Sequence, residues 1–152
     1  MGTRHMGREL ALKALYQMDF RKDKDGSNED LLALFEAFPA VDEVRRFATR
    51  LIEGVRGERI ALDQQLAGAL EHWSIGRLSR VDHNILRMGL YELLRMDDVP
   101  ARVTIDEAIE LAKTYGDQES GRFVYGVLDQ LAGRLNLKAK GEESNPAKVH
   151  QA

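Results

Sequence analysis

Apolar residues recur at three- and four-residue intervals along nearly the whole chain, and this period constrains the fold more than any other feature of the sequence. The clearest stripe consists of Val44, Phe47, Ala48, Leu51, Ile52 and Val55. Such spacing puts the apolar side chains on one face of a helix. The alternation of β-branched and polar residues that typifies strands is absent, and only three prolines interrupt the 152 residues. The sequence therefore predicts an all-α fold.

The periodic segments predict about seven helices. The expected helices cover residues 8–21, 29–38, 44–55, 58–73, 80–96, 105–115 and 120–135. Two capping boxes, Ser79 to Asp82 and Thr104 to Glu107, mark the starts of the fifth and sixth helices. The period is lost in residues 138–152, where glycine, serine and proline accumulate, so we expect a flexible tail there.

The composition removes several classes of chemistry. The chain has no cysteine, which excludes disulfides, thiol nucleophiles, zinc knuckles and iron–sulfur clusters. Its four histidines form no metal-binding pair, and no phosphate-binding glycine loop or nucleophile elbow occurs. We therefore expect no enzyme, no cofactor and no metal site. The N-terminus lacks an apolar signal segment and no apolar run is long enough to span a membrane, so we expect a cytoplasmic protein.

Two features suit nucleic acid despite a formal net charge of -3. The first is a basic N-terminal edge, in which Arg4 and Arg8 share one face if the helix reaches Arg4. A frayed, solvated terminus is the alternative. The second is a glycine-bearing loop that leads into a helix start carrying Arg122. Phe123 or Tyr125 there can stack on an unpaired base, although Phe123 also fits the core.

Residues 77–92 predict a surface for a protein partner. Charged and aromatic side chains, among them Arg80, Asp82, Arg87 and Glu92, fall at the start and along the length of a single helix. Such a helix can present a charged face to another protein. An ordinary amphipathic helix with a buried Tyr91 is the alternative interpretation.

The order and spacing of these motifs, from about residue 4 to residue 136, resemble the NusB family of bacterial transcription antitermination factors. The matching segments are Arg8-Glu9-Leu10-Ala11, Ala14-Leu15-Tyr16-Gln17, Trp73, Arg77-Leu78, Val81-Asp82, Ile85-Leu86-Arg87, Tyr91-Glu92-Leu93, Asp98-Val99-Pro100, Ile105-Asp106-Glu107-Ala108-Ile109-Glu110-Leu111-Ala112-Lys113, Tyr115-Gly116, Ser120, Phe123-Val124 and Gly126-Val127-Leu128-Asp129. The half from Trp73 onward carries the more specific part of this likeness.

The resemblance implies a single all-helical domain over residues 1–137, made of an N-terminal bundle (about 8–73) and a C-terminal bundle (about 78–137). It also implies a non-enzymatic function in transcription antitermination. Together with a small-subunit ribosomal protein, NusE, such a protein binds the single-stranded boxA element of nascent RNA. The assembled complex makes RNA polymerase resist termination, particularly during ribosomal RNA transcription.

Site residues follow from the same resemblance, position by position. The residues implied to contact RNA are Arg4, Arg8, Gln118, Glu119, Ser120, Arg122 and Phe123. The residues implied to face the protein partner are Arg80, Asp82, Arg87 and Glu92. Tyr125 stands where the family typically has asparagine, and we expect it to stack on RNA instead. The N-terminus and the loop are expected to converge into one patch.

Two further interpretations stay open. A NusB-like domain also forms the RNA-binding part of some rRNA cytosine methyltransferases. A protein-interaction module with weak or lost RNA binding is the other, because the N-terminus holds fewer basic residues than the family usually has and Tyr125 departs from its pattern. The apolar helix faces also leave a homodimer open.

Overall fold

The computed structural model describes residues 2–20, 28–70 and 74–141, and every regular element in these ranges is helical. The elements are α1 (Thr3–Met18), α2 (Asn28–Ala37), α3 (Asp42–Ala69), the 3-10 helix η1 (Ile75–Arg77), α4 (Arg80–Arg95), α5 (Ala101–Tyr115) and α6 (Ser120–Arg134). The predicted all-α fold is confirmed. None of the helices in the described ranges combines the length and apolar character that crossing a membrane requires.

The structure has six α-helices, close to the expected seven, because two expected helices meet at a kink within one element. The segments 44–55 and 58–73 were separated in the sequence by glycines, yet both belong to α3, which runs for 28 residues. The backbone departs from helical geometry only at Glu58 (φ -119°, ψ 16°). The two helical segments therefore meet at a kink beside Gly57, at the place where the sequence separated them, and buried residues on both sides join them in one element. Trp73 lies outside the described residues.

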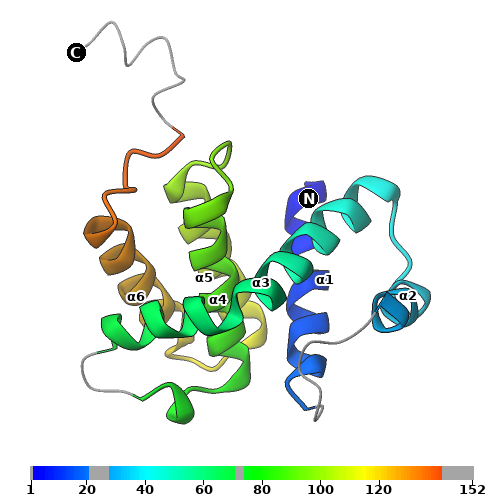
Figure 1. The fold of residues 1–152 in the computed structure, drawn as a ribbon, viewed down its shortest axis with the longest axis horizontal. Coiled ribbons are helices and arrows are strands. Elements are labelled where there is room, and N and C mark those ends of the chain that lie inside the picture. Colours follow the sequence, from blue (N-terminus) through cyan, green and yellow to red (C-terminus); the bar gives the residue numbers. More distant parts are fainter. Residues whose placement is uncertain (1, 21–27, 71–73, 142–152) are drawn as a thin grey trace, which may run out of the picture.

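The long helix α3 organises the molecule because it contacts helices from both halves of the chain. Figure 1 shows it crossing between α1 and α2 on one side and α4, α5 and α6 on the other. Its apolar stripe supplies Leu51 and Ile52 to the core, where they are fully buried with Leu86 of α4 and Leu128 of α6. Burial of each such side chain contributes about 1.5–3 kcal/mol.

The first helix approaches α3 closely at Gly7. A Cβ atom at this position would lie 2.8 Å from Cδ1 of Phe47 and 3.3 Å from the carbonyl oxygen of Val44. Real Cβ atoms do not come so close to a neighbour, so any larger residue would push α1 away from α3. The glycine therefore fixes where the N-terminal end of α1, with Arg4, lies on the surface of α3.

The start of α5 differs from the sequence prediction. Thr104 was expected to cap a helix, but α5 begins three residues earlier, at Ala101, with Pro100 as its N-cap. Proline has a fixed φ and no N–H group to satisfy, so it suits a helix start. Thr104 is instead inside the helix and buried, where its hydroxyl donates a hydrogen bond to Glu92 Oε1 (2.9 Å).

The segment after α6 also differs from the expectation over its first four residues. We expected a flexible tail from residue 138, but Lys140 is hydrogen-bonded to α4. Its Nζ donates to the carbonyl oxygens of Glu92 (2.7 Å), Leu93 (3.3 Å) and Met96 (2.8 Å). Gly141, at φ +81°, lies against Pro100. Residues 142–152 lie outside the described part of the chain.

Candidate nucleic-acid and partner interface

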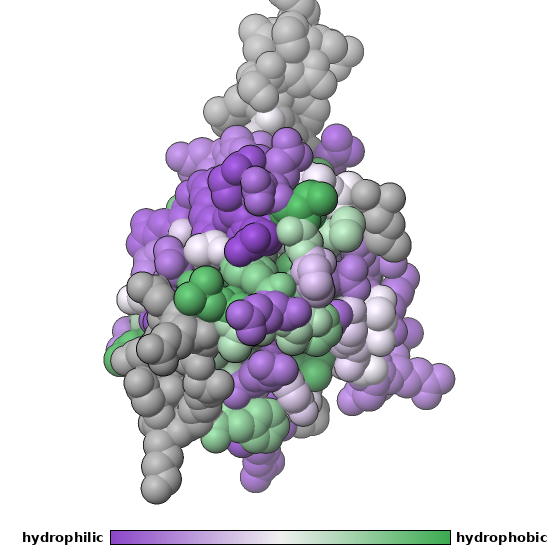
Figure 2. Space-filling model, turned by 90° about the vertical axis from the view of Figure 1, so that its right-hand side faces the viewer, coloured by the Kyte–Doolittle hydropathy of each residue, from purple (hydrophilic) through white to green (hydrophobic). Residues whose placement is uncertain are grey.

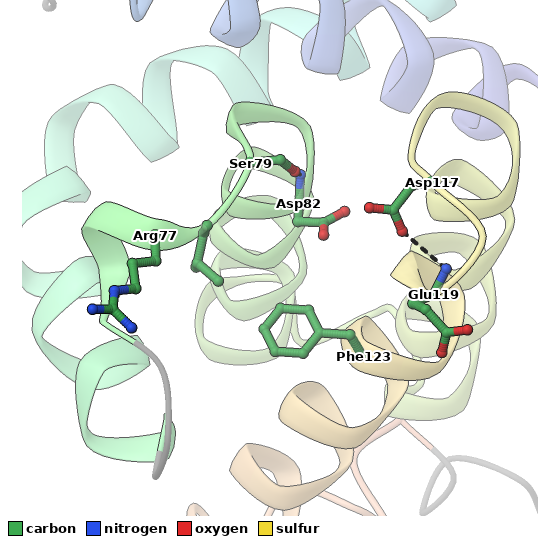
Figure 3. Close-up of a pocket in the computed structure, with 7 residues that line it drawn as sticks. Arg77, Ser79, Asp82, Asp117, Glu119 and Phe123 are labelled. Carbon is green, nitrogen blue, oxygen red and sulfur yellow. Dashed lines mark hydrogen bonds between the residues drawn. The ribbon is translucent and has the colours of Figure 1, made fainter.

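A pocket of about 260 Å³ lies where the α5–α6 loop faces the start of α4. Its lining consists of Arg77, Leu78, Ser79, Asp82, Asp117, Glu119 and Phe123. Figure 3 shows the carboxylates of Asp82 and Asp117 pointing toward one another from opposite walls, with the Phe123 ring below them. The pocket therefore brings the predicted RNA loop and the predicted partner helix together at one place.

The loop wall is built by hydrogen bonds between Asp117 and the first residue of α6. Ser120 Oγ accepts from the backbone N–H of Asp117 (3.0 Å), and Asp117 Oδ1 accepts from the N–H of Glu119 (2.9 Å). A Cβ at Gly116 would lie 2.4 Å from Ser120 Oγ, so only glycine allows this closure. Ser120 is buried and holds the loop in shape, although the sequence analysis placed it among the RNA contacts.

The α4 wall is set by a side-chain cap. Ser79 Oγ accepts from the backbone N–H of Asp82 (3.0 Å), which confirms one half of the predicted capping box; the reciprocal bond from Ser79 N–H to the Asp82 carboxylate is absent from the described residues. Asp82 is only 9% exposed, and its Oδ1 has no hydrogen-bond partner in the described structure. A buried carboxylate oxygen without a donor is costly.

The electrostatics of the pocket favour N–H donors over phosphate. Asp82, Asp117 and Glu119 contribute three carboxylates, whereas Arg77 is the one cation in the lining and its guanidinium points away from them (Figure 3). Carboxylates bind the guanidinium or ammonium group of a protein side chain, or an amino group of a base. No group of side chains in the described residues has the arrangement of a metal site.

The outer side of α6 carries three of the predicted RNA residues in accessible positions. Arg122 and Tyr125 are exposed and lie three residues apart, so they occupy neighbouring positions on the helix surface. Phe123 is half-buried: it packs against the core and also lines the pocket. Phe123 is therefore a core residue whose side chain also lines the pocket. Gln118 and Glu119 are exposed on the loop before the helix.

Arg8 and Glu92, which the sequence analysis assigned to two separate surfaces, form one interior ion pair. Arg8 is 3% exposed, and its Nε and Nη2 donate to the two carboxylate oxygens of Glu92 at 2.8 and 2.7 Å. Burial lowers the pKa of Arg8, but the hydrogen bond and charge of Glu92 outweigh this and hold the pKa above its usual value. The structure therefore presents neither side chain to RNA or to a partner.

Arg87 is also interior. Its guanidinium donates to both carboxylate oxygens of Asp63 (2.8 and 2.7 Å) and to Asp19 Oδ1 (3.3 Å), so it joins α4 to α3 and to the residue after α1. Arg80, in contrast, is exposed: it donates to the carbonyl oxygen of Asp19 (3.0 Å) and lies over the Phe20 ring. Of the four expected partner residues, Arg80 is exposed and Asp82, though mostly buried, lines the pocket.

The N-terminus and the loop do not converge into the single patch expected. α1 begins at Thr3, so Arg4 and Arg8 are both helical, but Arg4 pairs with Asp98 (2.8 Å), just before α5. The loop lies beyond the last residue of α5. A 15-residue helix is about 22 Å long, and this length separates Arg4 from the pocket.

Sequence analysis missed an exposed aromatic group next to Arg80. Tyr16 and Phe20 form an edge-to-face pair with ring centroids 5.1 Å apart. Tyr16, Phe38 and Tyr115 help to line a largely apolar groove of about 390 Å³ between α1 and the start of α4. The four-residue spacing of the two exposed aromatics was a usable signal, because residues four apart on a helix are neighbours.

Comparisons with known proteins agree with this architecture. The model of the NusB family matches residues 5–133. A transcription antitermination protein NusB from Geobacter sulfurreducens is 45% identical over 135 residues, covering 89% of this chain and 97% of its own. T. maritima NusB superposes with a TM-score of 0.75 at 36% identity, over 100% of this chain and 99% of that one. A crystal structure of the antitermination factors NusB and NusE in complex with dsRNA matches with a TM-score of 0.79 at 25% identity, over 88% and 98%. The chain belongs to the NusB family.

Proposed function

We propose that this protein is a transcription antitermination factor that binds boxA RNA together with NusE. The observation that carries the proposal is the pocket between α4 and the α5–α6 loop, where Asp82 Oδ1 lacks a partner beside the half-buried Phe123 ring. Relatives in the family are named for antitermination, and one solved relative contains NusE and RNA. RNA and NusE suit the two surfaces that meet at this pocket, the aromatic side of α6 and the acidic wall at the start of α4.

In this proposal one of the two surfaces binds RNA and the other binds NusE. The outer side of α6 offers Arg122 for a phosphate and Tyr125 for stacking, with Phe123 at the edge of the pocket. The start of α4 offers Arg80 and the free oxygen of Asp82, and the acidic lining favours a basic side chain of NusE. RNA and protein would thus meet at the pocket and each would complete the other's binding site.

The wider setting follows from this proposal. The protein acts in the cytoplasm, without a catalytic step or a bound cofactor, as one component of an antitermination complex on RNA polymerase. Its contribution is to hold a single RNA strand and NusE in a fixed relation. Unpaired bases suit this geometry, because a duplex would hide the ring faces that Phe123 and Tyr125 stack on.

Titration of labelled boxA RNA, with and without NusE and over a salt series, tests the proposal. We expect NusE to strengthen RNA binding. Phe123→Leu keeps an apolar core side chain but removes the ring, and loss of one stacked base should weaken RNA binding by about 1–3 kcal/mol. Circular dichroism checks that the variant is folded. Absence of RNA binding at low salt, with NusE present, would refute the proposal.

Asp82→Lys separates the two surfaces. Reversing this charge should weaken NusE binding strongly, because the partner's basic group would meet a like charge. Direct RNA binding without NusE should change little. Asp106→Lys makes the same charge change at an exposed position of α5 outside the pocket lining and serves as the control. Equal losses of NusE and RNA binding in Asp82→Lys would show that the two surfaces are one.

The acidity of the pocket favours a second candidate, a protein-interaction module that binds NusE but little RNA. This candidate predicts that NusE binds wild-type protein tightly and that Arg122→Ala leaves the complex with NusE and RNA unchanged. The antitermination proposal predicts that the same variant loses RNA affinity and becomes less sensitive to salt. The titrations above distinguish the two outcomes.

A further inference from the structure

Two exposed arginines on α3 form no close ion pair with the residues that the structure describes. Arg46 and Arg50 are exposed and lie one turn apart on the first half of the helix. Neither forms a hydrogen bond or an ion pair with any residue that the structure describes. Two other exposed arginines do form ion pairs, Arg95 with Glu58 (2.7 Å) and Arg4 with Asp98 (2.8 Å). Unpaired guanidinium groups on one helix face are available to bind an anion.

Arg4 joins these arginines from a different helix. Arg4, Arg46 and Arg50 line a hollow of about 300 Å³ together with Thr3, Glu43 and Phe47. The close crossing of α1 and α3 at Gly7 brings Arg4 to this place, and its guanidinium lies over the Phe47 ring, 5.3 Å from the centroid. We call Arg4, Arg46 and Arg50 the arginine surface. Figure 2 shows hydrophilic residues gathered over the upper part of the side on which α1 and α3 begin.

The charge around the hollow is positive where a ligand would bind. Three guanidinium groups line the hollow with one carboxylate, that of Glu43. Asp98, outside this lining, pairs with Arg4, and its charge also interacts with Arg50. A second hollow of about 660 Å³ adjoins the first along α3; it shares Arg46 and Arg50 and adds Arg45. Asp42 and Glu53 also line this second hollow, so the favourable position for an anion is the first one, between α1 and α3.

We propose that the arginine surface binds phosphate groups of the RNA backbone, as a contact separate from the pocket at the α5–α6 loop. Planar guanidinium groups bind phosphate oxygens in pairs. Phosphate contacts position a nucleic acid without reading its sequence and need no apolar centre. A protein interface needs such a centre, and Phe47, the apolar residue in this hollow, is 8% exposed. The proposal rests on the function proposed above.

The test compares wild-type protein with Arg46→Ala/Arg50→Ala in RNA titrations with NusE, using boxA RNA extended by flanking nucleotides. Losing two phosphate contacts should reduce the slope of log K against log salt by about 1.4. Between 50 and 200 mM salt, wild-type protein should then lose about seven times more affinity than the variant. Arg46→Lys/Arg50→Lys retains the charges and should keep most of the slope. The control Arg134→Ala/Lys138→Ala removes two exposed charges near the end of α6 and should keep the slope.

The outcomes distinguish this inference from the proposed function. An unchanged slope in Arg46→Ala/Arg50→Ala, alongside normal loss of affinity in Phe123→Leu, overturns the arginine surface alone. An equal loss in the control variant also overturns it, because the effect would be one of overall charge. Weaker NusE binding without RNA would assign the surface to a protein instead. Wild-type protein that binds no RNA overturns both proposals. Circular dichroism confirms that each variant is folded.

Discussion

At the scale of single residues, the most informative contact is the buried pair of Arg8 and Glu92. Eighty-four positions separate the two residues in the sequence, and Thr104 adds a third contact to the carboxylate. Sequence reasoning recognised Arg8 and Glu92 as special but placed both on surfaces. The charge pattern along one helix shows on which face a side chain lies. It does not show which distant helix packs over that face, so the burial of this pair could not have been predicted.

Breaking this pair should destabilise the fold. Arg8→Ala leaves the Glu92 carboxylate buried with only Thr104 to bind it, and we expect a loss of about 3–5 kcal/mol in the free energy of unfolding. Urea denaturation measures the loss. Arg8→Met/Glu92→Leu removes both charges and should recover most of it. If Arg8→Ala unfolds like wild-type protein but loses RNA affinity, Arg8 is a direct RNA contact and the interior assignment fails.

The network around Asp63 should make stability depend on acid. Burial raises the pKa of Asp63, but hydrogen bonds and charges from Arg87 and His83 outweigh it and hold the pKa far below its usual value. The unfolded chain takes up a proton near pH 3.9, whereas the folded protein does not. The stabilisation is therefore complete above about pH 4 and is lost as the pH falls further.

Asp63→Asn tests this dependence. The variant lacks the charge that Arg87 binds, so it should be less stable than wild-type protein at pH 7. The difference should shrink steadily below about pH 4, as wild-type protein loses its advantage. Urea unfolding between pH 3 and pH 7 measures both curves, with the exposed Asp106→Asn as control. A constant difference over the whole range would exclude Asp63 as the acid-sensitive group.

At the scale of elements, period and capping predicted most helices well, and the failures have physical reasons. Glycines between two apolar stripes indicated a boundary, and α3 is kinked there, at Glu58, but buried residues on both sides join the two segments in one element. Thr104 matched a capping box, yet Pro100 starts α5 earlier and the hydroxyl is used by Glu92. In both places tertiary contacts decide between local signals that are individually sound.

Gly7→Ala should loosen the crossing of α1 and α3. Alanine normally stabilises a helix relative to glycine by about 0.5–1 kcal/mol, but here its Cβ would meet Phe47 at 2.8 Å. We expect a net destabilisation of about 1–3 kcal/mol by thermal melting. Gly126→Ala in α6, where nothing lies within 4 Å of the new Cβ, should stabilise the protein instead. Equal effects at the two positions would mean that the crossing has room to spare.

At the scale of the whole molecule, the pocket and the arginine surface lie near opposite ends of α5, about 22 Å apart. The sequence located the residues of the pocket because they are close together in two motifs. It could not locate the arginine surface, since Arg4 and the two α3 arginines meet only through the crossing at Gly7. A motif of consecutive residues can be recognised in the sequence, whereas a surface shared by two helices depends on how those helices pack.

This separation predicts a dependence on RNA length. An RNA that covers only the pocket should bind wild-type protein and Arg46→Ala/Arg50→Ala equally. An RNA longer by about seven nucleotides, which spans 22 Å at a stacked rise of 3.4 Å, should gain affinity only for wild-type protein. Competition binding with a set of RNAs of increasing length measures the gain. A gain of equal size in both proteins would show that the added nucleotides bind elsewhere.

The contact of Lys140 with α4 has a consequence for the order in which the chain folds. The carbonyl oxygens of Glu92, Leu93 and Met96 belong to the end of α4, but their ammonium partner lies more than forty residues later. During synthesis the N-terminal residues leave the ribosome first, and domains fold as units. These three contacts to the end of α4 therefore form only after residue 140 has left the ribosome, when synthesis of the domain is almost finished.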